Sequence, residues 1–151
     1  MTSTFFSSLM RKMLAVTCLL PAILLAGCNG SATSPAPSFS QTDLRAGSGV
    51  PAVSGNLISV YYTGWLYDAS KPDQKGLQFE TNFGAETPLT FTLGAGQVIP
   101  GWDTGLLAMR VGGLRRLVIP PALAYGSVRN GPIPANATLI FEVELLSAEP
   151  Q

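Results

Sequence analysis

Side chains that commonly carry enzyme chemistry are scarce in this chain. Its 151 residues include no histidine and only two cysteines, Cys18 and Cys28, both near the amino terminus. The absence of histidine excludes Ser-His-Asp catalysis and histidine metal sites. The carboxylates of Glu80, Asp103 and Glu142 are scattered along the sequence rather than paired. Any catalysis must therefore proceed without ordinary acid, base or metal chemistry, and we expect neither a metal nor a cofactor.

Composition and charge argue against nucleotides and nucleic acids as ligands. Gly94-Ala95-Gly96 lacks the remaining residues of either glycine-rich nucleotide-binding fingerprint. Removal of a leader that contains Arg11 and Lys12 lowers Lys plus Arg from 9 to 7, while Asp plus Glu stays at 9, which gives a formal charge of −2. No run of basic residues remains after this removal. Binding to nucleic acid therefore has no electrostatic support.

The chain does hold a surplus of aromatic side chains at inward-facing positions of its predicted elements: Tyr62, Phe79, Phe91, Trp102, Tyr125 and Phe141. Each of them alone is an ordinary core residue. Together, beside a loop stiffened by Gly131, Pro132 and Pro134, they can line a shallow apolar pocket. Such a pocket binds an apolar group away from water. Two interpretations of Trp102, as the floor of a pocket or as a core residue only, stay open at this point.

The element that must position Trp102 is the only convincing helix of the domain. Pro100 suits a first helical position, and Gly112-Gly113 supplies a left-handed stop, so the pattern predicts a helix between these marks. Its apolar residues recur at helical spacing: Trp102, Leu106 and Met109. Gly101 and Gly105 each disfavour a helix by about 1 kcal/mol relative to alanine. We therefore expect these glycines to allow close approach to a neighbouring sheet.

The rest of the pattern predicts strands around this helix, at residues 57–67, 77–81, 88–93, 114–119 and 138–146. A short edge strand is expected between turns at 47–49 and 54–56, and a solvated loop at 68–76. Strands of this number against one short helix predict an α+β fold with a mostly antiparallel sheet and one covered face. We place this domain at residues 42–149.

The amino-terminal segment predicts export and a lipid anchor. Arg11-Lys12 precedes an apolar run, Met13 to Leu25, that is short for a membrane span and typical of a signal peptide over residues 1–27. Leu25-Ala26-Gly27-Cys28 resembles the lipobox of bacterial lipoproteins. The resemblance implies that Cys28 is the first mature residue and carries a diacylglycerol, usually with a further acyl chain. Several acyl chains anchor a protein stably. The alternative is a secreted protein with a chance cysteine.

Residues 28–41 then predict a flexible tether, because their Ser/Ala/Pro-rich composition cannot bury enough surface to become ordered. The resemblance to lipoproteins implies a location in the bacterial cell envelope, facing the periplasm. Asn29, rather than aspartate, follows the cysteine. By analogy with enteric lipoproteins this favours the outer membrane over the inner one.

Five segments of the domain resemble, in family order, the signature segments of FKBP-type peptidyl-prolyl isomerases: VYYTGWL at 60–66, VIPGW at 98–102, GGLRRLVIP at 112–120, LAYG at 123–126 and ATLIFEVEL at 137–145. The resemblance spans about residues 42–148. It implies an antiparallel half-barrel of five to six strands wrapped around the helix, with a pocket between them. It also implies isomerisation of X-Pro bonds in exported proteins.

The resemblance implies roles for thirteen residues. It places in the catalytic group Tyr62, Phe79, Glu80, Ile99, Trp102, Tyr125 and Phe141, and in the substrate-binding group Leu89, Phe91, Gln97, Val98, Pro132 and Ile133. The substrate proline is expected on the Trp102 indole, with hydrogen bonds donated by the Ile99 backbone N–H and the Tyr125 hydroxyl. The implied partners are X-Pro polypeptides and macrolide immunosuppressants, the implied state is a monomer, and no cofactor is needed.

Three positions depart from the family pattern. Glu80 stands where aspartate is common, Leu89 replaces an aromatic residue at the pocket rim, and Pro132 replaces an aliphatic residue in a shortened loop. Glu80 and Leu89 motivate a second hypothesis, a membrane-tethered chaperone or binding module that holds proline-containing segments with little turnover. A third hypothesis, a purely structural envelope lipoprotein, requires Trp102 and its aromatic neighbours to be buried with no pocket.

Overall fold

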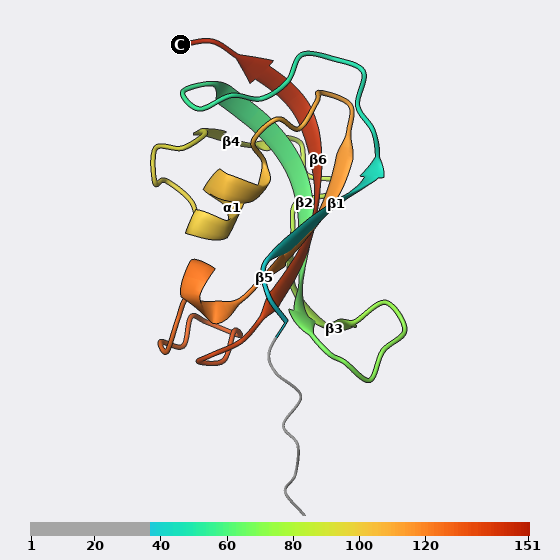
Figure 1. Cartoon of the computed structure of the whole chain (residues 1–151), viewed down its shortest axis with the longest axis vertical. Coiled ribbons are helices and arrows are strands. Elements are labelled where there is room, and N and C mark those ends of the chain that lie inside the picture. Colours follow the sequence, from blue (N-terminus) through green and yellow to red (C-terminus); the bar gives the residue numbers. More distant parts are fainter. Residues whose placement is uncertain (1–36) are drawn as a thin grey trace, which may run out of the picture. The chain divides into compact units, whose positions relative to one another are not determined.

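The computed structural model describes residues 37–151, so the predicted signal peptide, Cys28 and most of the predicted tether lie outside the described residues. The elements are β1 (Ser40–Arg45), β2 (Leu57–Tyr67), β3 (Lys75–Thr81), β4 (Leu89–Thr92), α1 (Pro100–Gly105), β5 (Leu114–Ile119), the 3-10 turn η1 (Pro121–Leu123) and β6 (Leu139–Glu149) (Figure 1). This confirms the predicted α+β class. No helix within the described range is both long and apolar enough to cross a membrane.

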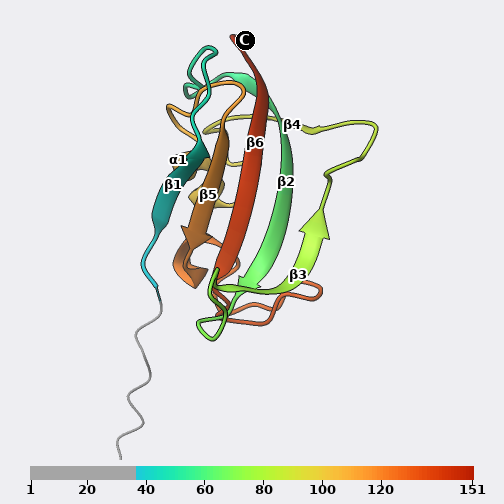
Figure 2. The same ribbon diagram turned by 90° about the vertical axis from the view of Figure 1, so that its right-hand side faces the viewer.

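The strands form one antiparallel sheet in the order β1-β5-β6-β2-β3, and β4 pairs with β2 (Figure 2). The two long strands, β2 and β6, run side by side from Leu66 opposite Leu139 to Leu57 opposite Glu149. Alternation along β6 turns one set of side chains to the concave face, and all of them are buried: Leu139, Phe141, Val143 and Leu145. Helix α1 lies against this concave face (Figure 1).

The predicted helix proves too long, because α1 ends at Gly105 rather than near Gly112-Gly113. Ala108 adopts a positive φ of 58°, which breaks the helix. The chain then turns back to pair with the segment before β2, where the Ala108 N–H donates to Ala52 O and the Ala52 N–H donates to Met109 O. These tertiary hydrogen bonds replace those of a longer helix. The apolar residues predicted on the helix are nevertheless buried: Trp102, Leu106 and Met109.

The prediction for the glycines of the helix is confirmed. A Cβ at Gly101 would lie 2.4 Å from Ile119 Cγ2, and a Cβ at Gly105 would lie 2.7 Å from Leu117 Cδ2. Only glycine lets the helix backbone approach strand β5 this closely. The helix that carries Trp102 is therefore seated directly on the sheet.

The edge of the sheet differs from the prediction. In place of a short strand between residues 49 and 54 there is a single bridge from Pro51 to Arg110. The edge strand is β1, which pairs with β5 and begins at Ser40, inside the predicted tether. All six β1 residues are exposed, so the strand lacks the alternation of apolar and polar residues from which it could have been recognised.

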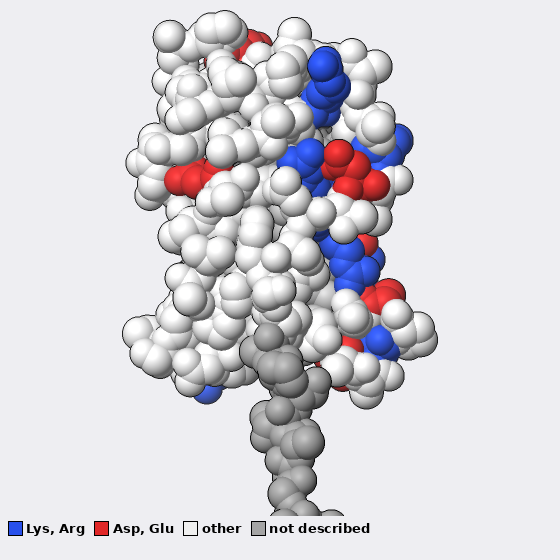
Figure 3. Space-filling view, viewed as in Figure 1, with Lys and Arg blue, Asp and Glu red and all other residues white. Residues whose placement is uncertain are grey.

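Charged side chains gather over the strands at the right of the view in Figure 3, whereas the surface over α1 is almost uncharged. The predicted solvated loop folds back here, since Arg116 donates hydrogen bonds to Asp73 O and Gln74 Oε1. Lys75, predicted in the loop, instead begins β3. Its Nζ lies 2.5 Å from Glu142 Oε1 and 4.3 Å from the centroid of the Trp65 ring. These contacts tie the start of β3 to side chains of β2 and β6.

Candidate functional site

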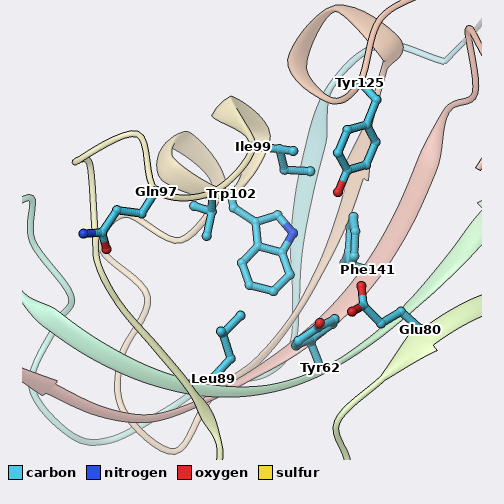
Figure 4. A pocket seen from close by; sticks show the side chains of 9 residues that line it. Tyr62, Glu80, Leu89, Gln97, Ile99, Trp102, Tyr125 and Phe141 are labelled. Carbon is cyan, nitrogen blue, oxygen red and sulfur yellow. The ribbon is translucent and has the colours of Figure 1, made fainter. Parts of the chain in front are cut away.

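A cavity of about 420 Å³ lies between α1 and the concave face of the sheet (Figure 4). Its lining residues are Tyr62, Glu80, Leu89, Gln97, Val98, Ile99, Trp102, Tyr125 and Phe141. They come from β2, β3, β4, β6, α1 and two loops, and all nine belong to the thirteen residues singled out in the sequence. The volume is in the range of small-ligand pockets. A cavity at Trp102 contradicts the hypothesis of a purely structural lipoprotein, which required none.

Trp102 forms the floor of the cavity and is only 3% exposed. Its ring meets Tyr62 edge-on at a centroid distance of 5.0 Å and Phe141 at 5.2 Å, and Phe91 packs against it at 5.9 Å. The indole Nε1 finds no hydrogen-bond acceptor within residues 37–151. Aromatic contacts, each worth about 0.5–1.5 kcal/mol beyond burial, therefore hold the indole in place.

The wall beside the floor depends on a glycine that the sequence analysis did not single out as a site residue. A Cβ at Gly64 of β2 would lie 2.7 Å from Phe79 Cζ and 2.8 Å from Phe141 Cε1. The absence of this Cβ lets Phe79 meet Phe141 edge-on with ring centroids 5.6 Å apart. Phe79 therefore supports the wall from behind and does not line the cavity.

Two tyrosine hydroxyls and one carboxylate meet at the mouth of the cavity (Figure 4). Burial raises the pKa of Tyr62 well above its usual value, and the adjacent Glu80 carboxylate raises it further. Burial also raises the pKa of Tyr125, with a smaller contribution from Glu80. Both hydroxyls are therefore protonated at neutral pH and can act as hydrogen-bond donors.

The backbone N–H of Ile99 is a further donor at the cavity. Ile99 is the extended residue before α1, and its carbonyl accepts the Trp102 N–H at 2.9 Å. Its own N–H makes no backbone hydrogen bond to the described part of the chain. Ile99 and Tyr125 thus present two donors near an apolar floor, which suits a peptide carbonyl.

Asp103, which appeared merely scattered in the sequence, fixes the loop that carries Ile99. Its carboxylate accepts the Gly94 N–H at 2.9 Å and the Gly96 N–H at 3.0 Å. Both glycines have positive φ, 81° and 70°, which turns their N–H groups toward the helix. Gln97 is held by the end of β4, since its Oε1 accepts the Thr92 N–H at 2.9 Å. The sequence signal for this role of Asp103 was the pair of glycines, Gly94 and Gly96, shortly before an acidic residue in the first turn of the helix.

Asn82 is a second residue that sequence reasoning missed. Its Oδ1 accepts the Tyr62 N–H at 2.6 Å and its Nδ2 donates to Val60 O at 3.1 Å. The side chain thereby takes the place of a neighbouring strand where β3 has ended, and it fixes the backbone that carries Tyr62. An asparagine in a predicted turn gave no specific signal of this role.

Four predicted site residues do not line the cavity: Phe79, Phe91, Pro132 and Ile133. Phe91 is 4% exposed and Ile133 is 5% exposed, and both pack in the core. Pro132 is exposed in the loop that a bridge between Asn130 and Ile133 closes. The loop thus turns Ile133 into the core and Pro132 toward solvent.

Comparison with known proteins agrees with this geometry. Residues 49–146 match the sequence profile of the family described as FKBP-type peptidyl-prolyl cis-trans isomerase. An FK506-binding protein of Neisseria meningitidis serogroup B is 50% identical over 105 residues, which cover 69% of this chain and 90% of that protein. FK506-binding protein 1 of Aspergillus oryzae is 46% identical over 106 residues, 68% of this chain and 91% of that protein.

Solved structures of the same family share the fold. FkpA from Escherichia coli is similar with a TM-score of 0.62 and 38% identity, covering 75% of this chain and 49% of that chain. AtFKBP13 is similar with a TM-score of 0.62 and 35% identity, covering 73% of this chain and 92% of that chain. The sequence profile, the relatives and the fold agree, and the chain belongs to the family of FKBP-type peptidyl-prolyl cis-trans isomerases.

Proposed function

We propose that the cavity isomerises X-Pro bonds by binding the pyrrolidine ring on the Trp102 indole and removing the amide from water. The observation that carries this proposal is a cavity of about 420 Å³ with the Trp102 indole as its floor, whose lining contains no histidine, cysteine or lysine. The lining supplies shape, aromatic faces and hydrogen-bond donors. Its ionisable groups are the Glu80 carboxylate and the hydroxyls of Tyr62 and Tyr125.

The physics of the reaction fits these groups. Rotation about a peptide bond crosses a barrier of about 18–20 kcal/mol because the amide loses its resonance at the perpendicular geometry. The planar amide is more charge-separated than the twisted one, so water stabilises the ground state more than the transition state. A site that excludes water removes this preferential stabilisation of the ground state, and so lowers the barrier relative to water. An acceleration of about 10⁴–10⁶ needs only about 5–8 kcal/mol.

In the proposed complex the two donors at the cavity hold the peptide on either side of the proline. The Ile99 N–H and the Tyr125 hydroxyl each donate to a substrate carbonyl, and such bonds are worth more where water is excluded. The Glu80 carboxylate lies beside the Tyr62 ring (Figure 4), and it raises the pKa of the Tyr62 hydroxyl, which favours the protonated donor. No proton is transferred to or from the protein in this scheme.

The test is an isomerase assay on the full chain, with a short X-Pro peptide whose trans form alone is cleaved by a coupling protease. We expect an acceleration over the uncatalysed rate and its inhibition by FK506, the ligand in the names of the similar proteins. Binding of the peptide without acceleration would favour a binding module with little turnover. If the chain neither binds the peptide nor accelerates its isomerisation, the proposed site is refuted.

We further propose that the domain is tethered to the bacterial envelope through a lipidated Cys28, with exported polypeptides as its substrates. Support comes from the segment Leu25-Ala26-Gly27-Cys28 and the apolar run before it. Replacement Cys28→Ala should release the expressed full chain from the membrane fraction. Cys18→Ala, in the same apolar run, is the matched control and should leave it there. Retention of the Cys28→Ala chain would contradict the anchor.

A further inference from the structure

The glycines of helix α1 face alternate residues of strand β5, and the next residue in this row of β5 is the buried Arg115. Gly101 sits over Ile119 and Gly105 sits over Leu117. Four helical residues advance about 6 Å and two strand residues advance about 6.7 Å, so the two rows coincide. The next residue of the same strand row is Arg115, which therefore lies at the carboxyl-terminal end of the helix.

The Arg115 side chain uses three nitrogens in two directions. Nη1 donates to Gly105 O at 2.8 Å and to Leu107 O at 3.0 Å, which are carbonyls at the helix end. Nε and Nη2 donate to the two carboxylate oxygens of Asp43 at 2.6 and 3.2 Å. Arg115 is 6% exposed, so its charge is buried and compensated by this pair. Helix-end carbonyls and edge strand β1 are thus joined through one guanidinium.

This link differs in kind from the other contacts of the helix. Among the hydrogen bonds described within residues 37–151, the bond from Arg115 to Gly105 is the one that joins α1 itself to the sheet. Asp103 ties α1 only to the loop before it. The packing of the glycines on Ile119 and Leu117 is apolar and lacks the directionality of a hydrogen bond. Without the polar link, the axial position of α1 on β5 depends on this packing and on the ring contacts of Trp102.

We propose that Arg115 is a positioning residue for isomerisation: by holding the carbonyl end of α1, it fixes where the Trp102 indole lies in the cavity. Trp102 lies between the two glycines of the helix, so a slip of α1 along β5 displaces the indole from Tyr62 and Phe141. A displacement of about 1 Å at a reacting site can cost a hundredfold in rate. The inference rests on the proposed role of Trp102 as the substrate floor.

The test compares Arg115→Met and Arg115→Lys with Arg116→Met in the full chain. Arg116 is the adjacent residue of β5, and it hydrogen-bonds to residues of the loop before β3 rather than to α1. Lysine keeps the charge beside Asp43 but has one ammonium and cannot reproduce the planar fork. We expect both Arg115 variants to lower kcat/KM by about tenfold or more while folded, and Arg116→Met to stay within about twofold.

A second measurement separates position from stability. The chain has two tryptophans, so a Trp65→Phe background leaves Trp102 as the only indole emitter. We expect its emission to shift in both Arg115 variants at urea concentrations where the protein is fully folded. If Arg115→Met does not fold, the emission and kcat/KM of Arg115→Lys test the inference. A folded Arg115 variant with unchanged emission and kcat/KM within twofold would overturn the inference, whereas an inactive wild-type chain would instead refute the proposed function.

Discussion

Replacement of Trp102 by leucine tests the floor of the cavity, and the chain supplies a matched control in its other tryptophan. Trp102 is 3% exposed and touches three aromatic rings, at centroid distances of 5.0, 5.2 and 5.9 Å. Trp65 lies on the convex face, beneath Lys75 at 4.3 Å, and is absent from the cavity lining. The two variants thus remove the same ring from opposite sides of the sheet, one from the helix on its concave side and one from strand β2.

The expected cost to stability follows from these contacts. Truncation of a buried aromatic side chain to alanine costs about 3–5 kcal/mol, and leucine retains part of the packing, so we expect Trp102→Leu to lower the free energy of unfolding by about 2–4 kcal/mol. The free energy of unfolding of a domain is typically about 5–15 kcal/mol, so the variant should remain folded at low temperature. Urea unfolding measures this cost directly.

The expected cost to activity is separate from the cost to stability. If the indole contributes about 1.4–2.8 kcal/mol of the roughly 5–8 kcal/mol that the reaction requires, kcat/KM falls by about ten- to a hundredfold. The assay is best run at about 10 °C, where uncatalysed X-Pro isomerisation takes minutes. Trp65→Leu should retain kcat/KM within about twofold. Equal activity of the wild-type chain and a folded Trp102→Leu variant would refute the role of the indole.

Three further predictions follow from the site and its supports. The pKa values of Tyr62 and Tyr125 are raised and the chain has no histidine, so kcat/KM should vary by less than about twofold between about pH 6 and pH 9. A larger change in kcat/KM with pH in that range would contradict hydrogen-bond donation by neutral hydroxyls. Replacement Gly64→Ala should cost about 1–3 kcal/mol in urea unfolding and lower kcat/KM, because its Cβ would lie 2.7 and 2.8 Å from two phenylalanine rings of the wall; an unchanged unfolding midpoint would contradict the close contact. Arg115 lowers the pKa of Asp43, so the pair stabilises the fold fully above the ordinary carboxyl pKa of 3.8, and this stabilisation is lost as the pH falls through the lower pKa of the folded state. The melting temperature of Asp43→Asn should therefore depend less on pH in that acid range than the melting temperature of the wild type. An identical pH dependence of the two proteins would contradict the pairing.

Much of the site was accessible from the sequence because side-chain periodicity reports which residues point inward. The alternation of β2 and β6 placed Tyr62 and Phe141 on the inner face of the sheet, and the helical spacing placed Trp102 on the apolar face of the helix. Periodicity does not say which inward side chains border empty space. Phe91 and Ile133 point inward as well, yet their neighbours enclose them and they belong to the core. Residue type and parity are local properties, whereas a cavity depends on all the surrounding elements.

The sequence by itself determined which catalytic side chains are absent and which aromatic residues could line a pocket. It contains no histidine, and both of its cysteines lie near the amino terminus. The tertiary structure alone decided where α1 ends, because hydrogen bonds between Ala52 and residues 108–109 replace the next turn of the helix. It also decided that an exposed, unpatterned β1 forms the edge and supplies Asp43 to Arg115. These features depend on pairing between segments far apart in the chain, which no local pattern of residues encodes.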